Sequence, residues 1–179
     1  VSNFQSGDVK ADGRSLPFLD NSFDVVTSID VLEHVPFKDR KKFIDECLRV
    51  SSKKVIISTP LGNKGHIQAE KDLLIFLKKK GFKSAYLEEH VEKGLPTLKE
   101  LKTYANDFVF KLICTGDYRL NICLTKMDVT SLKNPKLNRI FYLGKRLFNL
   151  ILNLFYFPFI KLSKETKANR VYLFIEKNK

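Results

Sequence analysis

The chain has 179 residues, of which 44% are hydrophobic and 29% charged, and its formal net charge is +12. This length and composition suit one globular domain with a sizeable core, and they exclude a chain that is disordered throughout. The charge is uneven: residues 1–100 hold 17 basic and 15 acidic side chains (net +2), and residues 101–179 hold 15 and 5 (net +10). Any affinity for a polyanion would therefore rest on the second half.

The cysteines number three, and no two of them form a Cys-x-x-Cys pair. This pattern argues against a disulfide framework or a zinc site and favours a reducing, cytoplasmic setting. We therefore expect no metal site, and we expect Cys114 and Cys123 to lie in the core. We also expect no signal peptide and no membrane span, since no apolar run reaches about 18 residues. Val1–Gln5 reads like the interior of a longer chain, which predicts a fragment.

The strongest local pattern lies between residues 22 and 59. Residues 22–29 and 54–59 have the β-branched density of buried strands. Between them, residues 36–50 place apolar side chains at helical spacing, with charged residues on the opposite face: Phe43, Ile44, Cys47 and Leu48. Strand, helix and strand at this length form a βαβ unit, so the two strands are predicted to be parallel.

Beyond Pro60 the pattern loosens. Apolar periodicity predicts a helix over residues 66–80, ended by Gly81. A second helix is predicted to start at Thr97, because Thr97 and Glu100 have the spacing of a capping box. Composition predicts three further elements, namely strands over 108–114 and 170–176 and a helical stretch over 117–168 that carries most of the surplus positive charge.

One apolar segment in this basic stretch, Leu147–Ile160, has two interpretations. It is too short to span a bilayer and is interrupted by Pro158. Asn149 and Asn153 lie four residues apart, which is typical of an amphipathic helix. The segment is either a lid helix packed over the sheet or, through residues 145–164, an interfacial helix that contacts anionic lipid at the membrane surface.

Three short stretches fall where a doubly wound sheet binds its ligands, at the carboxyl ends of strands. They are the run Asp12-Gly-Arg-Ser-Leu-Pro-Phe18 with the following Asp20-Asn-Ser-Phe-Asp24, the run Ser28-Ile-Asp-Val-Leu-Glu-His-Val35, and Ser58-Thr-Pro60.

In this order the stretches resemble the class I, Rossmann-like S-adenosylmethionine-dependent methyltransferases, most closely the type 11 group that includes ubiquinone- and menaquinone-pathway enzymes. The resemblance is carried by Asp-x-x-x-Leu-Pro-Phe, Asp-Asn-Ser-Phe-Asp-Val-Val and Leu-Glu-His-Val, and it covers roughly residues 8–62. A looser similarity continues through Glu88-Glu-His90 and Gly94-Leu-Pro96.

The resemblance implies the fold: an α/β, doubly wound and mostly parallel sheet in a single domain over residues 1–179, with helical cap regions at 66–107 and 116–168. It also implies a departure. The family's glycine-rich first loop and its ribose-binding acidic residue are expected before Asp12, and the eleven residues there hold neither. We therefore expect the sheet to be incomplete at its N-terminal side, and the chain as it stands to bind the cofactor weakly and to be inactive.

The resemblance also implies residue roles. Asp12 would accept a hydrogen bond from the adenine amino group of S-adenosylmethionine, and the backbone at Gly13 and Arg14 would meet the purine edge. Ser28 and Ile29 would lie along the methionine half of the cofactor and contact it mainly through their backbone.

Two residues would sit where the methyl acceptor arrives, and these are Glu33 and His34. A general base is needed only when the acceptor must lose a proton. His34 could serve because an imidazole titrates near neutrality, and His90 is a second candidate.

Each of these residues also has a purely structural interpretation. Asp12 could cap a turn, Glu33 could cap the following helix, and His34 could pack beneath it. The remaining candidates are expected at the surface: Asp20-Asn21-Ser22 as a turn, His66 as a solvated side chain, and His90 in a polar cluster with Glu88 and Glu89.

The resulting prediction is methyl transfer from S-adenosylmethionine to an unidentified small-molecule or lipidic acceptor. The competing prediction is a non-catalytic basic module that binds an anionic membrane surface. Nucleic acid is the weaker form of that alternative, because the positive charge lies in an apolar region without a recognisable nucleic-acid-binding motif.

Overall fold

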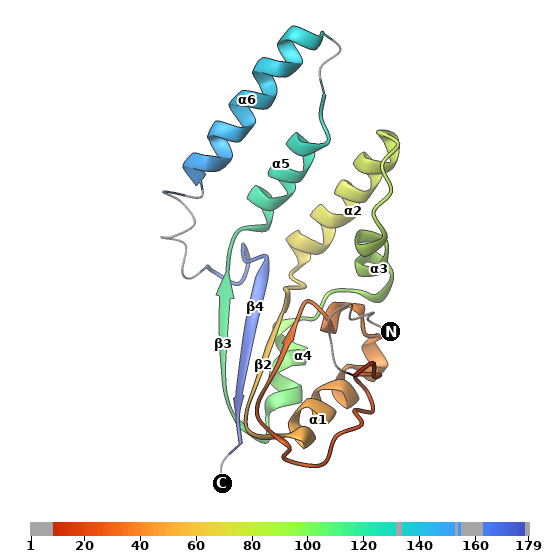
Figure 1. The fold of residues 1–179 in the computed structure, drawn as a ribbon, viewed down its shortest axis with the longest axis vertical. Coiled ribbons are helices and arrows are strands. Elements are labelled where there is room, and N and C mark those ends of the chain that lie inside the picture. The colour runs from red at the N-terminus through yellow and green to blue at the C-terminus, as the bar shows by residue number, and fades with distance from the viewer. Residues whose placement is uncertain (1–8, 132–133, 153, 155–162, 178–179) are drawn as a thin grey trace. The chain divides into compact units, whose positions relative to one another are not determined.

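The computed structural model describes residues 9–131, 134–152, 154 and 163–177 (Figure 1). Its sheet has four strands in the order β1–β2–β4–β3. The strands are β1 (Phe23–Ile29), β2 (Ser51–Pro60), β3 (Val109–Thr115) and β4 (Arg170–Glu176). The helices are α1 (Arg40–Val50), α2 (Lys64–Lys79), α3 (Ala85–Lys93), α4 (Leu98–Ala105), α5 (Tyr118–Asp128) and α6 (Pro135–Ile151), with short 3-10 turns η1 (Leu32–His34) and η2 (Phe37–Asp39).

The chain divides into two compact units, which are described separately. The first unit combines residues 1–62, 89–113 and 170–179, and it holds β1, β2, β4, α1 and α4. The second unit combines residues 63–88 and 114–169, and it holds α2, α5 and α6. Whether the helical regions 66–107 and 116–168 act as a cap stays a prediction.

The predicted βαβ unit is confirmed. Strands β1 and β2 pair in parallel, with Val26 opposite Val55 and Ile29 opposite Ser58. Helix α1 connects them and packs on both. Its apolar face is buried as its periodicity predicts, through Phe43, Ile44, Cys47 and Leu48. Because the strands are parallel, their carboxyl ends meet at one edge of the sheet.

The last strand, β4, returns in the opposite direction between β2 and β3. It pairs antiparallel with β2, with Ile57 opposite Leu173. Its alternate residues Val171, Leu173 and Ile175 are fully buried, whereas the residues between them are half-buried. The sheet is therefore mixed: β1 and β2 supply its parallel part, and the end of the chain supplies an antiparallel strand next to them.

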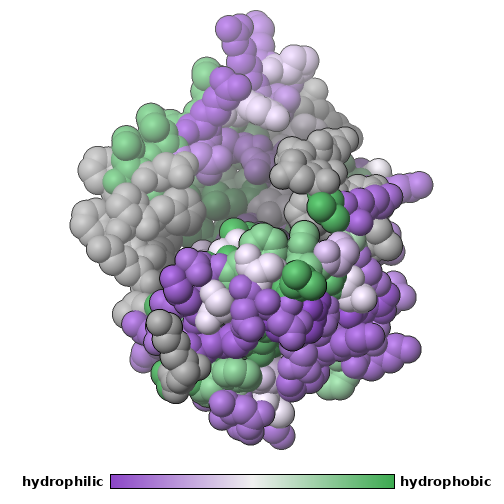
Figure 2. Space-filling view, turned by 60° about the horizontal axis from the view of Figure 1, so that its bottom comes forward, coloured by the Kyte–Doolittle hydropathy of each residue, from purple (hydrophilic) through white to green (hydrophobic). Residues whose placement is uncertain are grey.

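Strand β1 is more exposed than the buried strand that its composition predicts. Phe23, Val25 and Ile29 are 41%, 48% and 65% exposed. The reason is its place in the sheet: among the described residues β1 pairs with β2 alone and forms an edge. Figure 2 shows hydrophobic residues (green) lying among hydrophilic ones (purple) on one face of the molecule.

The helices after β2 follow the local signals closely, with one exception. Helix α2 begins after Asn63, whose side chain accepts a hydrogen bond from the His66 backbone, and it ends just before Gly81, which has a φ of +81°. Helix α4 begins with the predicted capping box between Thr97 and Glu100. The exception is α3, which periodicity did not predict.

The predicted helical stretch 117–168 contains α5 and α6. Helix α6 begins with Pro135 after the capping side chain of Asn134. The segment 155–162, and with it most of the second half of the proposed lid or interfacial helix Leu147–Ile160, lies outside the described residues. Within the described part of the chain, no helix is both long and apolar enough to cross a membrane.

Candidate functional site

The carboxyl end of β1 carries an unsatisfied polar group and a strained residue. Ser28 is 6% exposed, and its Oγ has no hydrogen-bond partner among the described residues. Asp30, the next residue but one, has a φ of +53°, in the left-handed region that side chains other than glycine seldom adopt. Its backbone N–H donates to Ser58 O over 3.0 Å, which ties the end of β1 to β2. Buried orphan groups and such strain are both concentrated at ligand sites.

Arg170, the first residue of β4, holds this edge together. Its guanidinium donates to both carboxylate oxygens of Asp30, over 2.5 and 3.1 Å, and to Ser58 Oγ over 2.8 Å. The sequence analysis assigned no role to Arg170. No local signal could have found it, because its partners are 112 and 140 residues away in the chain.

Glu33 is a buried carboxyl group close to the same edge. It is 1% exposed, and Thr59 at the end of β2 donates to its Oε2 over 2.9 Å. Burial raises the pKa of Glu33, because desolvation disfavours the charged form. The structure thus places Glu33 below the surface, in contact with the end of the neighbouring strand.

His34 is oriented by a carboxylate that the sequence analysis read as a surface residue. Its Nδ1 lies 2.7 Å from Glu89 Oε2, and Lys93 donates to Glu89 over 3.3 Å and to His34 O over 2.9 Å. The hydrogen bond from His34, followed by that from Lys93, lowers the pKa of Glu89. When Nδ1 carries the proton for Glu89, Nε2 carries the lone pair. With a side chain 35% exposed, His34 can still meet a ligand.

His90 completes a cluster with these two residues. It is 7% exposed, so the prediction that it lies in a surface cluster is wrong. Its ring centre lies 5.3 Å from that of His34. Glu33, His34 and His90 each present a potential metal-ligating atom, and these three atoms lie within 4.8 Å of one another. Because α3 was not predicted, nothing in the sequence brought His90 next to His34.

The loop around Asp12 forms a local turn. Asp12 is exposed, and its carboxylate accepts hydrogen bonds from the backbone and the guanidinium of Arg14, the shortest over 2.7 Å. These hydrogen bonds from Arg14 hold the pKa of Asp12 well below its usual range. Arg14 also donates to Asp39 over 2.7 Å. The geometry thus matches the alternative in which Asp12 caps a turn, and it leaves the adenine contact as a prediction.

Gly13 is needed at its position, although for a reason the sequence did not indicate. A Cβ built there would lie 2.5 Å from the Phe43 ring, so no larger residue fits without a shift of that ring. The close approach expected of Gly13 is therefore made to α1.

Three further expectations about burial are wrong, those for His66, Cys114 and Cys123. His66 is 3% exposed rather than solvated, and its ring stacks on Tyr118 at 5.3 Å within the second unit. Cys123 is exposed and Cys114 is intermediate, so neither is a core residue. Helix α5, which carries Cys123, buries none of its residues, and β3, which carries Cys114, has no fully buried residue either.

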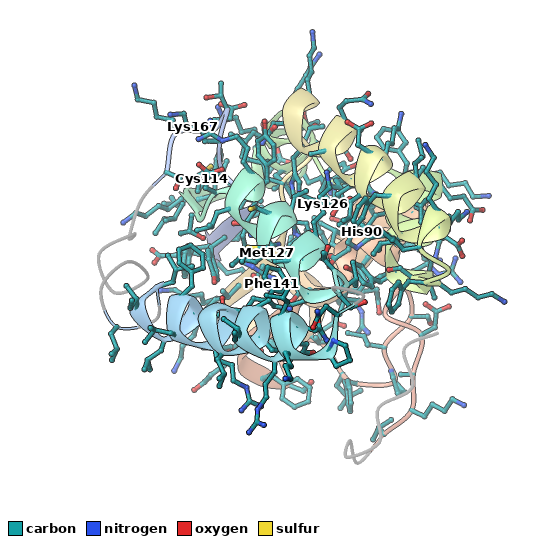
Figure 3. The ribbon with its side chains drawn as sticks, turned by 90° about the horizontal axis from the view of Figure 1, so that it is seen from above. His90, Cys114, Lys126, Met127, Phe141 and Lys167 are labelled. Atoms are coloured by element: carbon teal, nitrogen blue, oxygen red, sulfur yellow. The ribbon has the colours of Figure 1, made fainter. Side chains whose placement is uncertain are left out.

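The second unit contains an open groove of about 490 Å³. Its lining combines apolar with basic side chains: Phe76, Arg119, Ile122, Cys123, Lys126, Met127, Thr130 and Phe141. Figure 3 shows the labelled Lys126 and Met127 on α5 and Phe141 on α6, the helix beside it. Nothing in the sequence analysis pointed to this groove.

The parallel β1–β2 pair, its connecting helix and the polar residues at its carboxyl edge define a Rossmann-like α/β protein. The family model described as "Methyltransferase domain" matches residues 2–58, a segment that ends within β2 and includes Asp12, Ser28, Glu33 and His34. Over these residues, about a third of its length, the chain is similar to the methyltransferase domain family.

Several solved structures are similar over 94% of the chain, at low identity. They include a SAM-dependent methyltransferase from Archaeoglobus fulgidus (12% identity, TM-score 0.49, 66% of that chain covered), phosphoethanolamine N-methyltransferase 2 from Haemonchus contortus in complex with S-adenosyl-L-methionine (18%, 0.49, 36% covered), and a putative sarcosine dimethylglycine methyltransferase from Galdieria sulphuraria (15%, 0.46, 58% covered). The chain thus spans between about a third and two thirds of their length. A comparison with curated proteins finds no match.

Proposed function

We propose that the chain takes part in methyl transfer from S-adenosylmethionine to a small-molecule or lipidic acceptor. The observation that carries the proposal is the coincidence of the family match over residues 2–58 with a buried, unpartnered Ser28 hydroxyl at the carboxyl end of β1. A hydroxyl without a partner in the protein is one that a ligand can satisfy.

The cofactor supplies a methyl group on a sulfonium centre, which is already activated for displacement. The chain's own residues then have to bind, align and exclude water. Ser28 and Ile29 are proposed to lie along the methionine half of the cofactor. Asp12 is proposed to accept the adenine amino group, with Gly13 and Arg14 beside the purine. An adenine would have to share the Asp12 carboxylate with Arg14, which engages both of its oxygens.

The acceptor is proposed to arrive beside Glu33 and His34. Of these two residues, His34 is the better base, because Glu89 at Nδ1 leaves Nε2 able to take a proton. Glu33 is buried, and burial raises its pKa, which makes its ionised form less favourable than that of an exposed carboxyl group. This arrangement suits an acceptor whose nitrogen or oxygen must lose a proton.

The test is a titration of the isotope-labelled chain with S-adenosylmethionine, followed by chemical-shift changes, which report weak binding as well as strong. We expect the amide signals of Ser28 and Ile29 to move, and Asp12→Ala and Ser28→Ala each to weaken the response severalfold. Asp20→Asn is the matched control, because Asp20 is an exposed acidic residue of the same segment. Shifts confined to other regions, or equal binding by all variants, would reject the proposed cofactor site.

A second candidate function, contact with an anionic membrane surface, is favoured by helix α6. Its exposed apolar side chains recur at helical spacing along one face: Leu137, Ile140, Leu143, Leu147, Leu150 and Ile151, each between 46% and 66% exposed. Its basic residues Lys136, Arg139 and Arg146 are exposed, and the helix contains no acidic residue. This combination is typical of a helix that lies in a lipid interface.

Unlike the other basic residues of α6, Lys145 is buried, with 5% of it exposed. Its ammonium donates to Met127 O over 2.7 Å and pairs with Asp128 at 3.1 Å, both at the end of α5. Lys145 is thus committed within the second unit. Within residues 145–164, the lipid contact would instead rely on Arg146, and along α6 it would extend to Arg139 and the apolar face.

Co-sedimentation with phosphatidylcholine vesicles, with and without phosphatidylserine, tests the membrane contact. The double variant Arg139→Gln, Arg146→Gln should weaken binding to the anionic vesicles roughly thirtyfold, at about 1 kcal/mol for each cation near the surface. The double variant Ile140→Ser, Leu147→Ser should weaken binding to both kinds of vesicle. Val109→Ser is the control, because Val109 is also exposed but belongs to β3. Equal sedimentation with and without phosphatidylserine would reject the electrostatic part.

A further inference from the structure

The cluster of Glu33, His34 and His90 contains more ligating chemistry than the proposed proton transfer uses. Two imidazoles and one carboxylate form a common ligand set for divalent transition metals in proteins. The three potential ligand atoms already lie within 4.8 Å of one another. Around an ion with bonds of about 2.1 Å they would lie roughly 3–3.5 Å apart, so the widest separation has to close by about 1.5 Å.

Two members of the cluster, His34 and Glu33, form hydrogen bonds with residues outside it. Glu89 accepts at His34 Nδ1 over 2.7 Å, an arrangement that fixes the tautomer in which Nε2 offers its lone pair. Thr59 donates to Glu33 Oε2 over 2.9 Å. Outer hydrogen bonds of this kind orient metal ligands and are as much a part of metal sites as the ligands.

The local charge also suits a cation. Three carboxylates belong to this neighbourhood, those of Asp30, Glu33 and Glu89, and the basic side chains that contact two of them are Lys93 and Arg170. Both cations are already paired, Lys93 with Glu89 at 3.3 Å and Arg170 with Asp30 at 2.5 Å. Glu33 is buried and accepts a hydrogen bond from Thr59, and Arg170 attracts it electrostatically while donating its hydrogen bonds to Asp30 and Ser58. A bound cation would compensate the Glu33 charge more directly.

We propose that Glu33, His34 and His90 bind one divalent first-row transition-metal ion, with an open coordination position on the exposed side of His34. The nitrogen and carboxylate ligands favour Zn²⁺, Co²⁺, Mn²⁺ or Fe²⁺ over Ca²⁺, which prefers oxygen ligands alone. The sequence predicted no metal site, since the three residues come from two segments 56 residues apart.

The inference goes beyond methyl transfer and does not depend on it. A metal-bound His34 can no longer accept a proton, so the metal-loaded and metal-free proteins would use this residue differently. Binding of a metal requires a neutral imidazole and an ionised carboxylate, and therefore competes with protons. The S-adenosylmethionine titration and the metal titration are separate measurements on the same chain, so failure of either proposal leaves the other standing.

The test uses the full chain, stripped of metal and titrated with Co²⁺ alone, with binding followed by visible absorption and the stoichiometry by equilibrium dialysis. We expect one Co²⁺ per chain and a spectrum without a thiolate charge-transfer band, since the ligands are nitrogen and oxygen. Glu89→Gln, which keeps the volume but alters the outer hydrogen bond, should weaken binding 10- to 100-fold. His90→Gln and Glu33→Gln, which remove ligands, should weaken it further.

His66→Gln is the matched control, because His66 is as buried as His90 and also lies beside a carboxylate, Glu70 at 3.6 Å. It should bind Co²⁺ like the unaltered chain. Circular dichroism of every variant identifies any that fails to fold. If His90→Gln fails to fold, Glu89→Gln and Glu33→Gln still test the site. Absence of saturable binding, equal affinity of the ligand variants and the unaltered chain, or equal loss in His66→Gln would overturn the proposal.

Discussion

The two units of the chain use apolar helices in opposite ways. In the first unit, α1 buries Phe43, Ile44, Cys47 and Leu48, each at most 5% exposed, against the sheet. In the second unit, α6 has an equally regular apolar pattern, yet Ile140, Leu143 and Leu147 are 59–66% exposed, and its only buried residue is Lys145.

The difference shows which structural features helical periodicity predicts and which it does not. Apolar residues at intervals of three and four predict a helix with an apolar face in both cases. They do not say what covers that face. The face of α1 meets strands that are its neighbours in the chain, whereas the described part of the second unit leaves the face of α6 open. A continuous exposed apolar face is typical of an interaction surface.

The largest predicted contrast between the two units is in thiol reactivity. Burial raises the pKa of Cys47 in α1 to about 12, from an ordinary value of 9.0. The thiolate is the reactive form, so three pKa units make the folded-state reaction about a thousandfold slower than that of an ordinary thiol. Cys123 on α5 is exposed and should react readily. Iodoacetamide labelling followed by peptide mass spectrometry measures both rates.

Unfolding in urea is the control for this comparison, since it should make both cysteines equally reactive. Rapid labelling of Cys47 in the folded chain would mean that α1 is not packed on the sheet as described.

The next contrast is between two arginines. Arg40 is 1% exposed and joins separate segments of the first unit: it donates to Val35 O, to Glu100 Oε1 over 3.1 Å, and to the carbonyls of Lys93 and Gly94. Arg40→Met leaves Glu100 and these carbonyls without their partner, and it should lower the free energy of unfolding by about 3–5 kcal/mol. Urea denaturation followed by circular dichroism measures the loss.

Arg139→Met on α6 is the matched substitution in the second unit, and Arg139 is exposed. A surface change of this kind should shift the free energy of unfolding by no more than about 0.5 kcal/mol. If both variants lost the same stability, the network around Arg40 would contribute nothing beyond an ordinary surface residue.

Burial can also be compared through two isoleucines. Ile44 of α1 is fully buried, so Ile44→Ala should cost about 2–5 kcal/mol through lost burial and the cavity left behind. Ile140 of α6 is 66% exposed, so Ile140→Ala should cost under about 0.5 kcal/mol. Urea denaturation applies again. A large loss in Ile140→Ala would show that the face of α6 is covered in solution.

Those parts of the molecule that depend on neighbouring residues in the chain could be predicted from the sequence. The parallel β1–β2 pair and the capping box of α4 each depend on residues within a short stretch of sequence, and both predictions are confirmed. Ser28, Glu33 and His34 could be selected because the resemblance covers their segment. Their proposed roles stay predictions.

Contacts between distant segments could not be predicted. Glu89 and His90 reach His34 only because α3 returns to the end of β1, and Arg170 reaches Asp30 from the last strand. Such contacts are decided by the packing of the whole unit, which no local pattern in one sequence contains. The exposure of β1 has the same origin, since composition describes a strand well and its position in the sheet poorly.

The smallest predicted effect is the loss of a helix cap, and it should be about equal in the two units. Thr97 caps α4 in the first unit, accepting from the Glu100 backbone over 3.2 Å, and Asp117 caps α5 in the second, accepting from the Arg119 backbone over 2.9 Å. Because a cap acts locally, Thr97→Ala and Asp117→Ala should each cost about 1 kcal/mol, measured by urea denaturation.

The two caps differ in their response to acid. Hydrogen bonds from Arg119 lower the pKa of Asp117 below its ordinary value of 3.8. A carboxyl group with a lowered folded-state pKa stabilises fully above its unfolded-state value, and the contribution fades as the pH falls through the folded-state value. The Asp117→Ala difference should therefore be constant from pH 7 to about 5 and shrink below about pH 4. The hydroxyl of Thr97 does not titrate in this range, so a cap on α5 that survived acid unchanged would contradict the carboxylate's role in forming it.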